Sequence, residues 1–273
     1  DGLQKLVQNC TALEELVLSS CRVTNDHVAV LSGCTTLTSL SLAYCTHTDA
    51  VIATAVQHTP LLESLIVSNC KKLTDFGIQH AVKLLAMGRL QRLEFDNCFR
   101  VTDDAMDALA ASDEVANLRH LSIAHNVGLH EPAIRGLLSR LPRALFLNVS
   151  KCNVTGDTLN ALPPRESAEA GDDSVALEEL VASQCAGVTS VEDLMVRAKD
   201  LSRVDLRKTG LTDASVKAMS DHCRGLRQVN ISDCGSISDD GAITLATLPL
   251  EDLNVSSCPH ITDELIQYLV QYC

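Results

Sequence analysis

The chain carries little aromatic surface and few basic residues for its length. Only 3% of its 273 residues are aromatic and none is Trp, while 22 Lys and Arg face 35 Asp and Glu, for a formal net charge of −13. Nucleic acids and anionic membranes recruit proteins through basic stripes, and single-stranded nucleic acid also needs aromatic platforms. The composition argues against both as direct partners and leaves proteins.

Motifs of catalysis and of membrane attachment are also missing. No stretch resembles a transmembrane span, a targeting signal or a lipidation motif. No glycine-rich phosphate loop follows a strand, and no nucleophile elbow appears. We therefore expect a non-catalytic intracellular protein without a cofactor, cytoplasmic or cytoskeletal, with a cilium or flagellum among the candidate locations.

Cysteine is abundant, with 12 residues, but its spacing does not favour a metal site. No Cys-x-x-Cys pair occurs, and the Cys/His neighbours are Cys45-x-His47, His222-Cys223 and Cys258-x-His260. Zinc needs four converging ligands, so we expect no metal. A disulfide framework is not expected in a chain that is neither short nor led by a signal peptide, and the many free thiols favour a reducing compartment.

One position of the sequence recurs at intervals of 24 to 33 residues, and eight of the twelve cysteines occupy it. Each occurrence closes a phrase of the form L-x-x-L-x-L-x-x-C, intact in Leu13, Leu16, Leu18 and Cys21. Apolar residues two apart lie on one face of a short strand. We call these the ladder positions: Cys21, Cys45, Cys70, Cys98, Asn126, Cys152, Cys185, Thr209, Cys234 and Cys258.

Each ladder position is followed by a short turn, an aliphatic residue, and in most repeats a Ser or Thr with an acidic residue after it, as in Thr74-Asp75. The hydroxyl is expected to accept a hydrogen bond from the first turn of a helix, and the carboxylate suits the positive end of the helix dipole. Apolar residues then follow at helical spacing, as in Ile78, Ala81 and Leu85. We interpret the recurrent aspartates as helix caps and not as catalytic carboxylates.

The period predicts an α/β leucine-rich-repeat solenoid, a horseshoe of about ten repeats with parallel strands on the concave face and helices on the convex face. Residues 1–273 are expected to form one such domain. Its first residues fit a helix already under way and its last fit a helix that precedes another strand, so we expect a fragment of a longer protein.

The phrase Cys70-Lys71-Lys72-Leu73-Thr74-Asp75 and its counterpart at Cys258 resemble the cysteine-containing leucine-rich repeats of F-box/leucine-rich-repeat proteins. The resemblance covers essentially the whole chain and implies a ubiquitin-ligase adaptor whose concave face holds the substrate. No F-box is visible before Leu13. Similar repeats occur in subunits of the axonemal nexin-dynein regulatory complex, so an architectural subunit of that or another cytoskeletal complex is the alternative. Both functions imply protein partners in a multi-protein complex.

The longest interval between ladder positions contains a polar, proline-bearing insertion at residues 163–174. Its composition is that of a mobile loop. We consider a partner-binding or phosphorylated loop, with Ser167 and Ser174 as the modified residues, against a tolerated surface insertion.

Two predicted strands carry charged rows among otherwise small or neutral residues. Mixed charges favour a protein partner chosen by complementarity, although adjacent charges can also pair with each other and stay solvated. His120 adds a candidate pH-sensitive group. The candidate partner-binding residues are Arg92, Glu94, Asp96, His120, Arg203, Asp205, Arg207 and Lys208.

Overall fold

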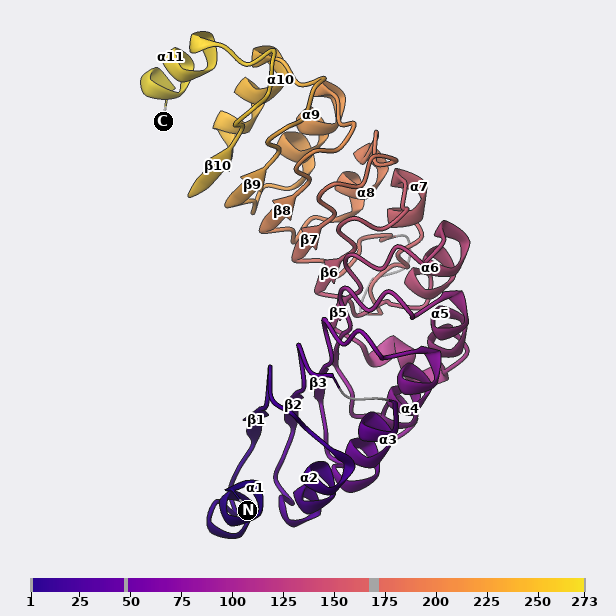
Figure 1. Cartoon of the computed structure of the whole chain (residues 1–273). Helices are drawn as coiled ribbons and strands as arrows, with labels where there is room; N and C mark the ends of the chain where they lie inside the picture. The colour runs from indigo at the N-terminus through magenta and orange to yellow at the C-terminus, as the bar shows by residue number, and fades with distance from the viewer. Residues whose placement is uncertain (1, 47–48, 167–171, 273) are drawn as a thin grey trace. The chain divides into compact units, whose positions relative to one another are not determined.

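The predicted alternation of strand and helix is present throughout the computed structural model, which describes residues 2–46, 49–166 and 172–272. The chain divides into two compact units, Asp1–Leu129 and His130–Cys273. In each unit every strand is three residues long and the helices lie on one side of the strands (Figure 1). These features confirm a leucine-rich-repeat solenoid with parallel strands.

The first unit contains five strands that pair in parallel in chain order. Leu16, Leu40 and Leu65 stand opposite one another at the strand centres and are buried. The elements are α1 (Gly2–Asn9), β1 (Glu15–Val17), α2 (Asn25–Ala29), η1 (Val30–Gly33), β2 (Ser39–Ser41), α3 (Asp49–His58), β3 (Ser64–Ile66), α4 (Asp75–Leu85), β4 (Arg92–Glu94), α5 (Asp103–Ala110), η2 (Asp113–Asn117) and β5 (His120–Ser122).

The second unit repeats this plan with five more parallel strands. Leu180, Val204 and Val229 form its row of buried strand centres. The elements are α6 (Glu131–Leu138), β6 (Phe146–Asn148), α7 (Gly156–Leu159), β7 (Glu179–Val181), α8 (Glu192–Arg197), β8 (Arg203–Asp205), α9 (Asp213–His222), β9 (Gln228–Asn230), α10 (Asp239–Ile243), η3 (Thr244–Thr247), β10 (Asp252–Asn254) and α11 (Asp263–Tyr272).

Most ladder side chains join their repeat to the one before it, whereas Thr209 donates to the carbonyl of Leu206 in its own repeat. The thiol of Cys70 donates to the carbonyl of Leu42 at 3.3 Å, and that of Cys185 donates to Val149 at 3.2 Å. Burial raises the pKa of Cys70 to about 12 and that of Cys185 to about 11, so both stay protonated and able to donate. Asn126 serves the same purpose, because its Nδ2 donates to the carbonyl of Phe95 at 2.9 Å.

The recurrence of the cysteines predicts a packing role for each of them, and two positions depart from that prediction. Nine of the eleven cysteines in the described part of the chain are buried, whereas Cys10 and Cys21 are exposed. Cys21 follows β1, and the described residues contain no strand before β1 whose carbonyl could accept from its thiol, as Leu42 accepts from Cys70. The expectation that every cysteine has a packing role was therefore wrong for these two.

A left-handed turn ends every strand and was not predicted. The residue just before each ladder position has a positive φ, between 53° and 62°. Left-handed backbone costs a non-glycine residue about 1–2 kcal/mol. The ten residues are Ser20, Tyr44, Asn69, Asn97, His125, Lys151, Gln184, Lys208, Asp233 and Ser257.

The Thr-Asp pairs act mainly between repeats, which corrects the capping prediction. Thr74 donates its backbone N–H to Asp49 Oδ1 at 2.9 Å and its hydroxyl to Asp49 Oδ2 at 2.6 Å. Ser238 donates to Asp213 in the same way, at 2.8 and 2.7 Å. The hydroxyl of Thr74 also accepts from the first turn of α4, as predicted, but Ser238 makes no such cap bond.

We call this pair of hydrogen bonds, from the N–H and hydroxyl of Ser or Thr to the Asp of the preceding repeat, the staple between repeats. Glycines leave room for it. A Cβ on Gly241 would stand 2.6 Å from Cγ of Asp213, and one on Gly77 would stand 2.6 Å from Oδ1 of Asp49. Real Cβ atoms do not approach other atoms so closely, so both carboxylates depend on a glycine in the next repeat. Such close approach is a principal reason for glycine inside an element.

The ends of the predicted insertion are anchored to the second unit. Arg197 on α8 donates to the carbonyls of Asn160 and Asp173 at 3.0 Å and to that of Leu162 at 2.6 Å. Arg165 Nη1 forms an ion pair with Asp200 at 2.7 Å. These contacts hold both flanks of the insertion. Residues 167–171 lie outside the described part of the chain.

Candidate interaction surface

The side of each sheet that faces away from the helices is the surface on which the sequence placed the partner-binding residues. We call it the open sheet face and define it by the first and third residues of each strand and the residue two further on. Along β4 these are Arg92, Glu94 and Asp96, and along β8 they are Arg203, Asp205 and Arg207. Alternation along a strand puts them opposite the buried strand centres.

The charged row on β4 is largely satisfied within the first unit. Arg92 Nη2 lies 2.6 Å from Glu94 Oε1, and His120 Nε2 on β5 lies 2.9 Å from the same oxygen. Asp96 Oδ1 accepts from the Ser122 hydroxyl at 2.6 Å and from the Ala124 N–H at 2.7 Å. The alternative in which adjacent charges pair with each other therefore describes this row.

Titration of the two carboxylates reflects the same arrangement. Burial favours a raised pKa for Glu94, but the His120 hydrogen bond and the Arg92 charge outweigh it, so its pKa is lowered. Burial dominates at Asp96, whose pKa is raised despite the hydrogen bonds from Ser122 and Ala124. Glu94 is thus held ionised by its neighbours, with 15% of its side chain exposed.

The charged row on β8 has looser partners, and they lie on neighbouring strands. Arg203 Nη1 stands 3.7 Å from Glu179 on β7, and Arg207 Nε stands 3.5 Å from Asp233 after β9. Both arginine side chains remain about half exposed, at 50% and 46%. Lys208 is exposed at the left-handed turn that follows.

A shallow polar hollow of about 130 Å³ lies beside this row. Charged and amide side chains from three consecutive strands surround it. Among its lining residues, Asn230 Nδ2 donates to Asp205 Oδ2 at 3.2 Å. The polar lining residues are Arg203, Asp205, Gln228, Asn230, Asp252 and Asn254. The sequence analysis identified Arg203 and Asp205. It did not identify the amide side chains or Asp252, because the residues on β9 and β10 were judged to be mostly small or neutral.

The structure describes only one of the two serines that the sequence suggested as modified residues of a regulatory loop. Ser167 lies outside the described residues. Ser174 is fully buried, and its hydroxyl donates to Asp172 at 2.7 Å while accepting from Arg165 Nε at 2.8 Å. A kinase would reach Ser174 only after this segment opened, so modification there stays a prediction.

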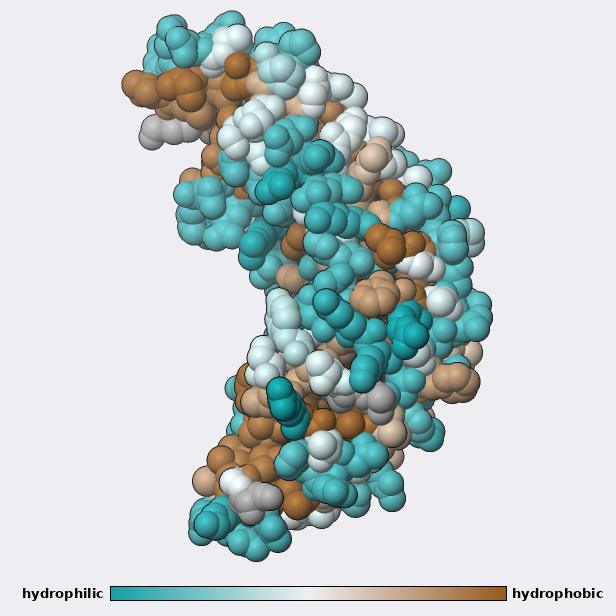
Figure 2. Space-filling view, viewed as in Figure 1, coloured by the Kyte–Doolittle hydropathy of each residue, from teal (hydrophilic) through white to brown (hydrophobic). Residues whose placement is uncertain are grey.

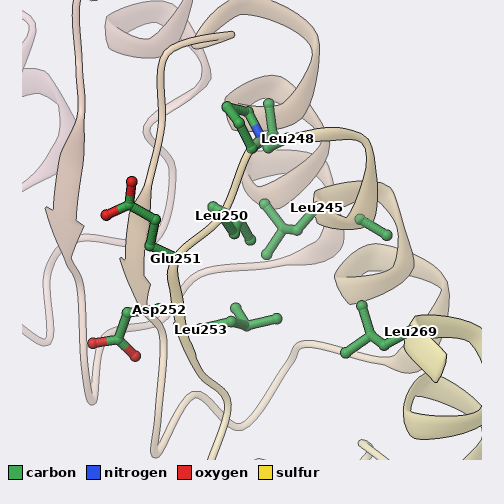
Figure 3. A pocket seen from close by; sticks show the side chains of 9 residues that line it. Leu245, Leu248, Leu250, Glu251, Asp252, Leu253 and Leu269 are labelled. Carbon is green, nitrogen blue, oxygen red and sulfur yellow. The ribbon is translucent and has the colours of Figure 1, made fainter. Parts of the chain in front are cut away.

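An apolar pocket of about 490 Å³ lies between η3, β10 and α11 in the second unit. Figure 3 shows Leu245, Leu250, Leu253 and Leu269 directed into it, with the carboxylates of Glu251 and Asp252 turned the other way. Apolar surface also gathers around α11 (Figure 2). This is the face that, in earlier repeats, the next repeat covers.

No helix among the described residues is both long and apolar enough to cross a bilayer. No three His, Cys, Asp or Glu side chains in the described ranges gather as metal ligands would. His47, which belongs to one of the three Cys/His neighbours, lies outside those ranges.

Comparisons with known proteins agree with the fold. A leucine-rich-repeat family profile matches residues 222–246. F-box/LRR-repeat protein 23 of Arabidopsis thaliana is 33% identical over 144 residues, which cover 49% of this chain and 31% of that protein. The chain thus spans about a third of the length of this curated relative.

Solved structures share the architecture at low sequence identity. A chain of the yeast Rad7–Elc1 complex aligns with a TM-score of 0.66 at 17% identity, covering 98% of this chain and 76% of its own. A chain of the TLR13–ssRNA13 complex aligns with a TM-score of 0.57 at 16% identity, covering 95% of this chain and 38% of its own. At these identities the likeness concerns the fold alone.

Proposed function

We propose that this leucine-rich-repeat chain is a non-catalytic module that recognises substrates for an F-box-type ubiquitin ligase, because its cysteine-containing repeats resemble those of F-box/leucine-rich-repeat proteins. In this proposal, the open sheet face of the second unit, around Arg203, Asp205, Arg207 and Lys208, contacts the substrate protein.

The observation that carries the proposal is the difference between the two charged rows. On β4, Arg92 and His120 both lie within 3 Å of one carboxylate oxygen of Glu94, so a partner would have to break close pairs. On β8, the nearest carboxylates to Arg203 and Arg207 stand at 3.5 Å or more. Exposed pairs of that kind contribute about 0–1 kcal/mol, so a partner's carboxylate can replace them at little cost.

The chemistry of the hollow defines the segment it would hold. Arginine forks bind carboxylates, and the amides of Gln228 and Asn230 can pair with a peptide backbone. Asp205 and Asp252 require a donor in return, such as a lysine, an arginine or an N–H group. A polar segment carrying both signs of charge therefore fits this face, as expected where complementarity sets specificity.

Two observations support the ligase role over a generic binding surface. The repeats resemble those of F-box/leucine-rich-repeat proteins over the whole chain. The Arabidopsis relative, which is 33% identical over 144 residues, has both F-box and LRR-repeat in its name. The alternative is an architectural subunit of a cytoskeletal or axonemal complex, which would use the same face for permanent contacts.

The test is quantitative mass spectrometry of proteins that co-purify with the full-length protein from its native cell. The variant R203A/D205A/R207A should lose its specific partners at least tenfold while keeping a wild-type circular dichroism spectrum. The matched control R227A/E251A removes an exposed ion pair of 2.7 Å in the same unit and should keep them.

Each outcome decides between the functions. Recovery of Skp-like and cullin subunits together with substrates that the triple variant loses would support the ligase adaptor. Structural components in fixed stoichiometry, without a cullin, would instead establish the architectural role. Equal capture by the triple variant and wild type would refute the assignment of the open sheet face.

A further inference from the structure

One edge of the first unit concentrates positive charge in a chain whose net charge is −13. The loops between strand and helix in this unit, residues 20–24, 44–48, 69–74, 97–102 and 125–130, contain four Lys or Arg and no Asp or Glu. We call their exposed cationic and aromatic residues the cationic loop edge. They are Arg22, Tyr44, Lys71, Lys72, Phe99 and Arg100.

Backbone pairing places these loops side by side. The N–H of Tyr44 donates to Ser68 at 2.9 Å, and that of Asn69 donates to Asp96 at 2.7 Å, so the ladder of hydrogen bonds continues past the strands into the loops. Thr74 and Arg100 form a further parallel bridge. Neighbouring strands are about 4.8 Å apart, so the cations of the first, third and fourth repeats lie along one row about 15 Å long.

The four cations have no carboxylate within ion-pair distance among the described residues, unlike Arg92 on the open sheet face of the same unit. Asp75, the carboxylate nearest in sequence to Lys71 and Lys72, accepts both the N–H and the hydroxyl of Thr102, at 2.7 and 2.8 Å. This carboxylate is oriented toward the next repeat, so the cations beside it are not held in an ion pair within the described residues and can contact a partner.

Two aromatic side chains stand among these cations. Tyr44 is 63% exposed and Phe99 is 50% exposed. They are two of only seven aromatic residues in the chain, so their exposure is not a by-product of an aromatic-rich surface. Aromatic residues and arginine are enriched where proteins bind proteins.

We propose that the cationic loop edge binds an extended acidic segment of a partner protein. Charge complementarity selects that occupant, and a row of about 15 Å matches four or five residues of an extended peptide. A nucleic acid would bring many more negative charges, which the chain's net charge of −13 repels. The proposal concerns a different surface from the open sheet face of the second unit and does not depend on it.

Fluorescence anisotropy with a labelled 12-residue peptide of alternating glutamate and leucine tests the proposal. Wild type should bind, with a Kd that rises steeply between 50 and 300 mM NaCl as ionic contacts are screened. The variant K71Q/K72Q/R100Q should bind about tenfold more weakly, and F99A about threefold. A peptide with glutamine in place of glutamate should not bind.

The matched control R89Q/K217Q/R224Q removes three exposed cations from other parts of the surface and should bind as wild type does. Unchanged affinity in the loop-edge variant, or an equal loss in this control, would overturn the proposal. Absence of peptide binding would overturn it as well, and binding of a single-stranded oligonucleotide instead would assign the edge to nucleic acid. The open-sheet variant R203A/D205A/R207A should keep the peptide, which separates failure here from failure there.

Discussion

Removing the carboxylate of Asp213 should uncouple two neighbouring repeats of the second unit. This side chain starts α9 and accepts both the N–H and the hydroxyl of Ser238, which starts the next helix. In the variant D213A, the Ser238 N–H loses its protein acceptor, while the hydroxyl can turn to water. The perturbation is therefore local to one contact between repeats.

Its magnitude follows from the two bonds. A hydrogen bond to a charged acceptor contributes about 1.5–3 kcal/mol. Because Asp213 is only half-buried, we take the lower end, about 1.5 kcal/mol, for each of its two hydrogen bonds with Ser238. Loss of an acidic residue at the helix start adds about 0.5 kcal/mol. The total cost of D213A is about 3.5 kcal/mol. D240A, an exposed aspartate in the first turn of α10, loses only the helix-dipole contribution and should cost about 0.5 kcal/mol.

Urea unfolding gives the free energies, and hydrogen exchange of the Ser238 amide reports the contact itself, because repeat proteins can unfold locally. A double-mutant cycle of D213A with S238A should give a coupling energy of about 1 kcal/mol. Distant, independent sites add to within about 0.3–0.5 kcal/mol. Additivity within that margin, together with a cost no larger than that of D240A, would refute the staple between repeats.

Four further outcomes follow from the structure. G241A should cost about 1–3 kcal/mol by overpacking against Asp213, and much of that cost should vanish in the D213A background; urea unfolding checks both. R197A should cost about 2–3 kcal/mol through its three carbonyl contacts, and R197K should not restore it, since an ammonium lacks the fork; thermal melts compare the two. K151G should be at least as stable as wild type and K151V less stable by about 1 kcal/mol, because φ is +58° there; urea midpoints rank them. Since the pKa of Glu94 is lowered in the fold, its stabilisation is present above the ordinary value near 4.5 and is lost as the pH falls through the folded pKa, so the drop in unfolding free energy between pH 5 and 3 should be smaller in E94Q.

Much of the fold could be predicted because each element repeats the same chemistry. The phrase ending at Cys45 or Cys70 places a strand and a turn, and the structure has β2 and β3 at those phrases. The left-handed turn residues could not be found this way. Asn, Asp and His, which favour this conformation, occupy four of the ten positions. Serine, tyrosine, glutamine and lysine occupy the other six, so residue identity alone does not mark the turn, and the backbone path from strand to loop imposes the conformation.

The partners of the polar residues were harder to predict than their positions. A sequence shows that Arg203 and Asp205 are two apart on a strand, but the partners of Arg203 and Arg207 are Glu179 and Asp233, on neighbouring strands. Pairing between side chains on neighbouring strands depends on the register of those strands, which a single sequence does not show. For the same reason, the sequence predicted that the aspartates of the Thr-Asp pairs cap their own helices. It did not show that they also accept hydrogen bonds from the next repeat.

Residues that recur in a solenoid and residues that do not are under different physical demands. A recurrent Cys70 or Asp75 bonds to the adjacent repeat, so any change there costs stability at one interface of the stack. Lys72 and Phe99 recur in no other repeat at their positions and make no contact that the stack requires. Substitution at such positions leaves the free energy of folding almost unchanged. Residues that bind a partner can therefore occupy these positions without loss of the fold. In this chain the cations of the cationic loop edge and Phe99 fall on those positions, whereas Tyr44 occupies the left-handed turn that every repeat has.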